Sequence, residues 1–181
     1  MSRPGRLILA LAVCLLAAVS ASAKFGHKTS PPPPKKPAPS YDPSRDPAKD
    51  LQNAIAQAGK THKRILLDVG GDCCVYCNMM DATFAGHPSL QRARDENYIT
   101  VRVNYSPENP NGTFLSKYPK IADYPHFFVL DSDGTLLHSQ PTHKFEHGKT
   151  YNAGKIDEFL KKWAQPPRHW LNRVDNVLTP M

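Results

Sequence analysis

The chain has 181 residues, of which 40% are hydrophobic and 22% are charged. This is the composition of a globular protein with one sizeable core, and it excludes fibrous, coiled-coil and multi-pass membrane proteins. The formal net charge of +7 is mildly basic. No basic stripe interleaved with aromatic residues accompanies this charge, so no nucleic-acid partner is expected.

The N-terminus has the three parts of a secretory signal peptide. Arg3 and Arg6 precede the apolar run 7–19, which leads to the small residues Ala21-Ser22-Ala23. We therefore expect a signal peptide over residues 1–23, cleavage after Ala23, and a periplasmic or secreted protein that is not an integral membrane protein. An uncleaved anchor is less favoured, because this run reaches only about 20 Å as a helix. Cleavage leaves 21 basic and 16 acidic residues, a net charge of +5.

Residues 24–47 contain eight prolines, including Pro31 to Pro34, and almost no apolar residues. Such a stretch buries too little surface to fold, so we expect a disordered proline-rich linker that is either a spacer or a leader without function. The folded domain is expected over residues 48–165. In the tail, residues 166–181, apolar residues recur at helical spacing and predict a short amphipathic helix packed on its own domain.

Within the domain, helical and strand patterns alternate. The expected elements are a helix over 48–59 that ends at Gly59, a strand over 64–69, a cysteine-bearing helix to about Ala85, a helix over 88–97, a strand over 98–104, one helical turn over 114–118, a hairpin of strands over 127–130 and 135–139, and a helix over 155–164. A parallel β-α-β half is thus followed by a hairpin and a covering helix. The predicted fold class is α/β, a central mixed sheet flanked by helices on both faces.

Three cysteines, Cys73, Cys74 and Cys77, remain after cleavage removes Cys14. Their clustering excludes a framework of structural disulfides and indicates redox chemistry or metal binding. Cys74-Val75-Tyr76-Cys77 is a C-x-x-C at a strand-to-helix junction, and one helical turn brings its two sulfurs within bonding reach. An inert disulfide clip is less favoured, because so short a loop gains little stability from closure.

The two ends of the C-x-x-C are expected to have different roles. The helix N-terminus favours the thiolate of Cys74, whereas Cys77 lies one turn deeper and is less exposed. We expect Cys74 to attack a substrate disulfide and Cys77 to resolve the mixed disulfide, or the same cycle to run backwards and donate a disulfide.

Asp68 lies inside the apolar run Ile65–Val69, where an ionised carboxylate is costly to bury. Its pKa is expected to be raised there, and it is placed to take and return the proton of Cys77. A carboxylate at an exposed strand edge is the alternative.

Two motifs in the right order resemble the thioredoxin family. Residues 65–77, ILLDVGGDCCVYC, resemble the family's strand, buried aspartate, short turn and active-site helix. Residues 117–130, KYPKIADYPHFFVL, followed by Asp133-Gly134, resemble the segment with its cis-proline and hairpin. The resemblance covers about residues 48–165. It implies a thioredoxin-like fold and a cell-envelope thiol–disulfide oxidoreductase that needs no cofactor.

Carried over by position, the resemblance makes Cys74 the nucleophile, Cys77 the resolver and Asp68 the proton relay. It also implies that Pro125 is the cis-proline and that Tyr124 offers its backbone to an extended substrate. The expected substrate-binding residues are Tyr76, Tyr124, Pro125 and His126. The implied partners are protein thiols and disulfides, with a membrane thiol reductant or oxidant as candidate redox partner.

The chain departs from the family pattern at three places. Cys73 stands where tryptophan is usual, and it is expected to be a small buried hydrophobe, an alternative disulfide partner or a metal ligand, in that order. The central pair Val75-Tyr76 does not specify the direction of electron flow. His126 follows the cis-proline, where it is either an imidazolium that stabilises the Cys74 thiolate or a surface histidine at a strand start.

A copper-binding metallochaperone on the same fold is the alternative function. Cys73 and Cys77 form a C-x-x-x-C, and thiolates with His138, His143 or His147 are suitable copper ligands. The redox enzyme is preferred and no metal site is assigned, because Asp68, the C-x-x-C and Pro125 together form the complete redox apparatus.

Overall fold

The structure, a computed structural model, describes residues 40–166. Its elements are α1 (Pro47–Thr61), β1 (Arg64–Gly70), α2 (Val75–Gly86), α3 (Pro88–Asn97), β2 (Tyr98–Asn104), α4 (Gly112–Leu115), β3 (His126–Leu130), β4 (Leu136–Pro141), the 3-10 helix η1 (Thr142–Phe145), β5 (Glu146–His147), β6 (Thr150–Tyr151) and α5 (Ala153–Lys162). The expected signal peptide, most of the linker, and the tail after residue 166 lie outside the described residues. Within residues 40–166, no helix has the length and apolarity needed to cross a membrane.

Helix α1 is defined by a cap at each end. The Asp46 side chain accepts hydrogen bonds from the N–H groups of Ala48 and Lys49, which satisfies donors of the first turn. The helix continues through Gly59, contrary to the expected stop, and ends where His62 adopts a left-handed conformation with φ 55°. The exposed Gly59 costs the helix some stability without breaking it, because glycine is permitted in a helix interior.

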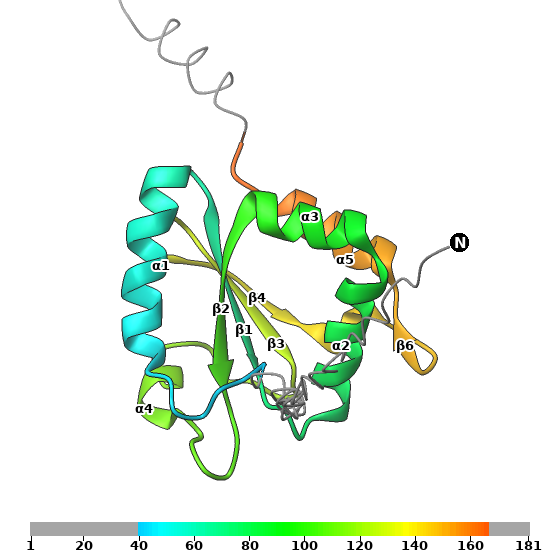
Figure 1. Ribbon diagram of the computed structural model, residues 1–181, viewed down its shortest axis with the longest axis horizontal. Coiled ribbons are helices and arrows are strands. Elements are labelled where there is room, and N and C mark those ends of the chain that lie inside the picture. The colour runs from blue at the N-terminus through cyan, green and yellow to red at the C-terminus, as the bar shows by residue number, and fades with distance from the viewer. Residues whose placement is uncertain (1–39, 167–181) are drawn as a thin grey trace, which may run out of the picture. The chain divides into compact units, whose positions relative to one another are not determined.

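The four-stranded sheet has the order β2-β1-β3-β4. Strands β1 and β2 are parallel, with Asp68 opposite Arg102, while β3 runs antiparallel to both β1 and β4. A parallel pair needs a long crossover connection, which α2 and α3 provide here. Figure 1 shows this crossover on one side of the sheet and α1 on the other.

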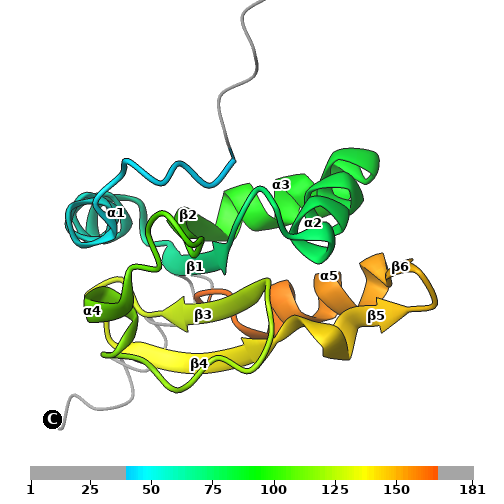
Figure 2. The same ribbon diagram turned by 90° about the horizontal axis from the view of Figure 1, so that it is seen from below.

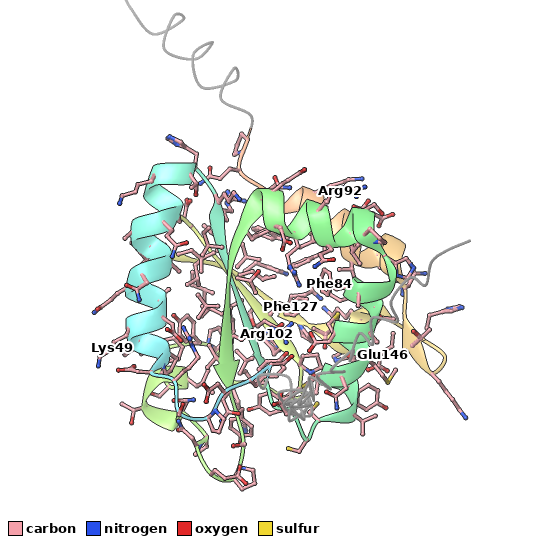
Figure 3. The ribbon with its side chains drawn as sticks, viewed as in Figure 1. Lys49, Phe84, Arg92, Arg102, Phe127 and Glu146 are labelled. Atoms are coloured by element: carbon pink, nitrogen blue, oxygen red, sulfur yellow. The ribbon has the colours of Figure 1, made fainter. Side chains whose placement is uncertain are left out.

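Helices cover both faces of the sheet, as Figure 2 shows with α1 and α4 on one side and α2, α3 and α5 on the other. Because side chains alternate along a strand, the residues of β1 divide between two cores. Ile65, Leu67 and Val69 join the core under α1 and α4, while Leu66 packs with Phe84 and Phe127 under α2 and α5. Phe84 and Phe127 lie between α2 and the strands in Figure 3. The predicted α/β class with helices on both faces is confirmed.

Asp68 and Arg102 share the face that α2 covers, because they follow Leu66 and Thr100 by two residues on paired strands. The alternation of β1 therefore aims the carboxylate towards the cysteine-bearing helix.

Two parts of the fold differ from the expectation. The hairpin of β5 and β6, which turns at Gly148 with φ 61°, and the preceding turn η1 were not predicted, because two-residue strands carry no readable periodicity. The one-turn helix α4 begins at Gly112, two residues before its predicted start. These elements lie outside the four-stranded sheet and leave its topology unchanged.

The folded part also begins earlier than predicted. Tyr41, which the sequence placed in the linker, is only 1% exposed and is among the largest fully buried side chains. Its backbone N–H donates to Asp72 in the turn before the cysteines. Residues 40–46, named here the N-terminal segment, therefore belong to the domain and reach its cysteine-bearing end.

Gly70 and Gly59 give a matched test of packing at this end. A Cβ at position 70 would lie 2.6 Å from Cys77 Sγ and 2.9 Å from the Tyr41 ring, whereas a Cβ at position 59 meets nothing within 4 Å. Gly70→Ala should lower the free energy of unfolding by about 1–3 kcal/mol through overpacking. Gly59→Ala should raise it by about 0.5–1 kcal/mol. Urea denaturation measures both, and equal effects would contradict the packing around Gly70.

Candidate active site at the start of α2

Cys74 is the N-cap residue of α2, so its sulfur lies at the positive end of the helix dipole. Its backbone is extended, and its Sγ accepts a hydrogen bond from the Cys77 N–H at 3.2 Å. A thiolate at this atom keeps that donor and gains from its charge. Cys74 is partly exposed, whereas Cys77 is fully buried.

Cys77 is held as a neutral thiol. Burial raises the pKa of its thiol, and a hydrogen bond with Cys74 and the negative charges of Cys74 and Asp68 raise it further. The two sulfurs therefore differ in access, because Cys74 is reachable from solvent and Cys77 is not. The roles of nucleophile for Cys74 and resolver for Cys77 stay predictions.

Asp68 is 4% exposed, so the alternative of an exposed strand edge is wrong. Burial raises the pKa of its carboxyl, while the Arg102 charge and a hydrogen bond from Tyr41 oppose that rise. Arg102 Nη2 lies 3.9 Å from Asp68 Oδ2 and is bound more closely to Asp81. Figure 3 shows Arg102 between β2 and α2. The result is a buried carboxylate with raised proton affinity next to a buried thiol.

The peptide bond between Tyr124 and Pro125 is cis, as the resemblance implied. The Cys74 thiol donates to the Tyr124 carbonyl oxygen at 3.6 Å, which is a long contact suited to sulfur. The Tyr124 ring stacks on Tyr105 with centroids 4.3 Å apart. The Pro125 carbonyl accepts from the Thr142 hydroxyl at 2.5 Å. Tyr105 and Thr142 thus hold the Tyr124–Pro125 segment, whose carbonyl oxygen at Tyr124 contacts the Cys74 sulfur.

A groove of about 380 Å³ opens beside Cys74. It is lined by Gly71, Cys73, Cys74, Tyr105, Ser106, Pro107, Pro110 and Tyr124. Val75 and Tyr76 are 69% and 48% exposed on the neighbouring surface. The accessible thiol is therefore surrounded by apolar and aromatic side chains. A larger hollow lies along the outer edge of β2, but no cysteine lines it, so we place the chemistry in the smaller groove.

His126 fits neither of its two expected states. It is 3% exposed, its Nε2 lies 2.9 Å from Ser139 Oγ, and its ring packs against Phe128. Burial lowers its pKa to about 4, so the imidazole is neutral at physiological pH. It is therefore neither a surface histidine nor an imidazolium beside Cys74, and its side chain is not available to a substrate.

Cys73 is exposed, so its first expected role as a buried hydrophobe is wrong. The copper alternative gains no support from the geometry. Within residues 40–166, no three His, Cys, Asp or Glu side chains come together as metal ligands. His143 instead pairs with Asp123, and His138 stacks on Trp163.

Sequence reasoning missed four residues of the site. Asp68 and the cysteines carry recognisable signals, but nothing in the pattern marks their partners. The missed residues are Tyr41, Arg102, Tyr105 and Thr142. Arg102 had one usable signal, since a charged residue in the centre of a predicted strand requires a partner.

The buried His126 predicts a specific loss of stability in acid. Its pKa is about 4 when folded and about 6.5 when unfolded, so the unfolded state binds more protons between these values. The free energy of unfolding should therefore fall as the pH drops from about 6.5 to 4, by roughly 1–3 kcal/mol from this group. His126→Gln should remove that part of the pH dependence. Denaturation at several pH values, with the exposed His147→Gln as control, tests this; an unchanged slope in His126→Gln would contradict it.

Comparison with known proteins agrees with this geometry. A family model described as thioredoxin-like matches residues 46–132. The thiol:disulfide interchange protein DsbD of Pseudomonas fluorescens is 28% identical over 118 residues, which cover 64% of this chain. The match spans only 18% of that relative.

Two solved structures share the fold. A disulphide isomerase from Xylella fastidiosa Temecula1 superposes with a TM-score of 0.62 at 20% identity, over 70% of this chain and 98% of that one. The oxidised C-terminal domain of Neisseria meningitidis DsbD gives a TM-score of 0.50 at 21% identity, over 65% of this chain and 96% of that one. The solved structures show a thioredoxin-like fold, and the family-model match, the C-x-x-C at the start of α2, the buried Asp68 and the cis Pro125 support a thioredoxin-family protein.

Proposed function

We propose that this protein is a thiol–disulfide oxidoreductase that exchanges a Cys74–Cys77 dithiol/disulfide with protein substrates in the cell envelope. One observation carries the proposal. An accessible sulfur at a helix N-terminus lies in front of a buried thiol, which in turn has a buried carboxylate beside it. The thiol:disulfide interchange and disulphide isomerase functions named for the similar proteins support the same chemistry.

In the reducing direction, the Cys74 thiolate attacks a substrate disulfide. One substrate sulfur leaves as a thiolate, and the other is joined to Cys74 in a mixed disulfide. Cys77 then gives its proton to the Asp68 carboxylate and attacks the Cys74 sulfur. The Cys74–Cys77 disulfide forms, the second substrate sulfur leaves, and that sulfur takes the proton. Two electrons have moved from the dithiol to the substrate, and the reverse sequence donates a disulfide.

The groove beside Cys74 suits an extended polypeptide. The cis Pro125 presents the Tyr124 backbone next to the reactive sulfur, and the stacked Tyr105 and Tyr124 rings give a flat aromatic wall. The exposed Val75 and Tyr76 extend the apolar surface on the other side of Cys74. Such a surface binds a chain mainly through its backbone and through apolar side chains, so the proposal includes a range of protein substrates.

The cell-envelope location rests on the signal-like residues 1–23. Cleavage after Ala23 would release the domain with its proline-rich linker into an oxidising compartment, where a thiol reductant must receive electrons through the membrane. A membrane thiol reductant or oxidant is therefore the proposed redox partner. The match to part of a thiol:disulfide interchange protein supports a partner that exchanges disulfides with this chain.

Removing the resolving thiol should trap the substrate. In Cys77→Ser the mixed disulfide on Cys74 has no internal nucleophile to release it, so covalent adducts should accumulate with a disulfide-bonded protein such as insulin. Non-reducing electrophoresis and mass spectrometry identify the adduct and the attached cysteine.

The matched control separates the exposed cysteine from the proposed nucleophile. Cys73→Ser/Cys77→Ser should keep the adduct, and Cys74→Ser/Cys77→Ser should lose it. An adduct found on Cys73, or one that survives the loss of Cys74, would contradict the assignment of the nucleophile.

A further inference from the structure

Both the backbone N–H and the side-chain hydroxyl of Tyr41 make hydrogen bonds next to the candidate active site. Its backbone N–H donates to Asp72 Oδ1 at 3.0 Å, in the turn that leads to the cysteines. Its hydroxyl donates to Asp68 Oδ1 at 2.7 Å, and the residue is 1% exposed. The N-terminal segment, which lies outside the βα framework of the fold, thus supplies a side chain to the buried carboxylate.

Gly70 shows how closely Tyr41 approaches the resolving thiol. A Cβ at this position would lie 2.9 Å from the Tyr41 ring and 2.6 Å from Cys77 Sγ. The ring and the sulfur therefore pack over the same glycine, two residues along β1 from Asp68. Only a residue without a side chain leaves room for both groups.

The other charged groups around Asp68 act at longer range. From β2, Arg102 lies 3.9 Å from the carboxylate, stacks over the Tyr41 ring at 4.9 Å and binds Asp81 of α2 with two hydrogen bonds. Arg94 of α3 contributes a further favourable charge. Among the described residues, Tyr41 alone hydrogen-bonds to the Asp68 side chain.

We propose that Tyr41 is a positioning residue for the Cys77 step, its hydroxyl keeping Asp68 ionised and oriented while its ring shields the Asp68–Cys77 pair from water. This inference rests on the function proposed above. It adds a residue outside the C-x-x-C that influences the Cys77 step through Asp68. The step itself is unchanged: Cys77 gives its proton to Asp68, forms a bond to the Cys74 sulfur, and the bond from Cys74 to the substrate breaks.

The hydroxyl has a definite electrostatic consequence. A hydrogen bond to a carboxylate favours its ionised form, and the bond from Tyr41 holds the pKa of Asp68 below the value that burial alone would give. Without the hydroxyl, Asp68 should hold its proton to higher pH. At a given pH less carboxylate is then present to accept the Cys77 proton, and the Cys77 step slows.

Tyr41→Phe in the full mature chain tests the proposal, because it removes the hydroxyl and keeps the ring. Tyr98→Phe is a matched control, since the Tyr98 hydroxyl also makes a buried 2.7 Å hydrogen bond, to the Leu160 carbonyl, near the opposite end of β2. Carbon-13 NMR follows the titration of the Asp68 carboxyl in each protein. Quenched-flow trapping of the mixed disulfide measures the Cys77 step from pH 5 to 9.

In Tyr41→Phe, Asp68 should titrate at higher pH than in the wild type or in Tyr98→Phe. The Cys77 step should slow about tenfold at the acidic end of this pH range and recover at high pH, since hydrogen bonds to charged groups have effects of this order. In an Asp68→Asn background, Tyr41→Phe should have no additional effect.

An Asp68 titration that is identical in the wild type and in Tyr41→Phe would overturn the proposal, even if the rate falls. An additional slowing in the Asp68→Asn background would also overturn it, because Tyr41 would then act by another route. If the wild type performs no disulfide exchange but the Asp68 titration shifts as expected, the proposed function fails while the coupling of Tyr41 to Asp68 stands.

Discussion

Asp68 is an ionisable group on a strand that is buried on both faces, and the site is organised around that constraint. A carboxylate without compensation would be too costly in this position, and the Tyr41 hydroxyl and the Arg102 guanidinium supply that compensation. Asp81, which binds the arginine, opposes it, because its negative charge raises the pKa of Asp68. The compensation is incomplete, because the pKa of Asp68 remains raised. A fully compensated aspartate would be a poor acceptor for the Cys77 proton.

Burial also distinguishes the two cysteines of the C-x-x-C, since Cys77 is buried and Cys74 is partly exposed. Both are close to the first turn of α2, but Cys74 caps the helix at the surface while Cys77 faces the sheet. Burial raises the pKa of the Cys77 thiol, whereas Cys74 remains partly exposed at the helix N-terminus. The alternation of side chains along β1 places Asp68 below α2. The Tyr124–Pro125 segment lies against Cys74, which lines the groove beside it.

The predictable parts were those with local signals. The apolar run of β1 and the C-x-x-C at its end locate the reactive centre, and the strand patterns give the mixed sheet. Tyr41 has no such local signal, because a single aromatic residue in a proline-rich stretch predicts a linker. Its burial depends on a hydrogen bond to Asp68, which is 27 residues away in the sequence. The prediction for His126 is wrong for a related reason. A histidine at a strand start is expected at the surface, but β4 and Phe128 enclose its ring.

The most direct test is a redox titration of the purified protein in glutathione buffers, with free thiols alkylated and assigned by mass spectrometry. Cys74 and Cys77 should be converted together in one reversible two-electron step while Cys73 remains a thiol. The midpoint should lie between about −270 mV, typical of a reductase, and about −120 mV, typical of a disulfide donor. If no Cys74–Cys77 disulfide forms in this range, or if the reversible disulfide includes Cys73, then Cys74 and Cys77 are not the redox-active pair.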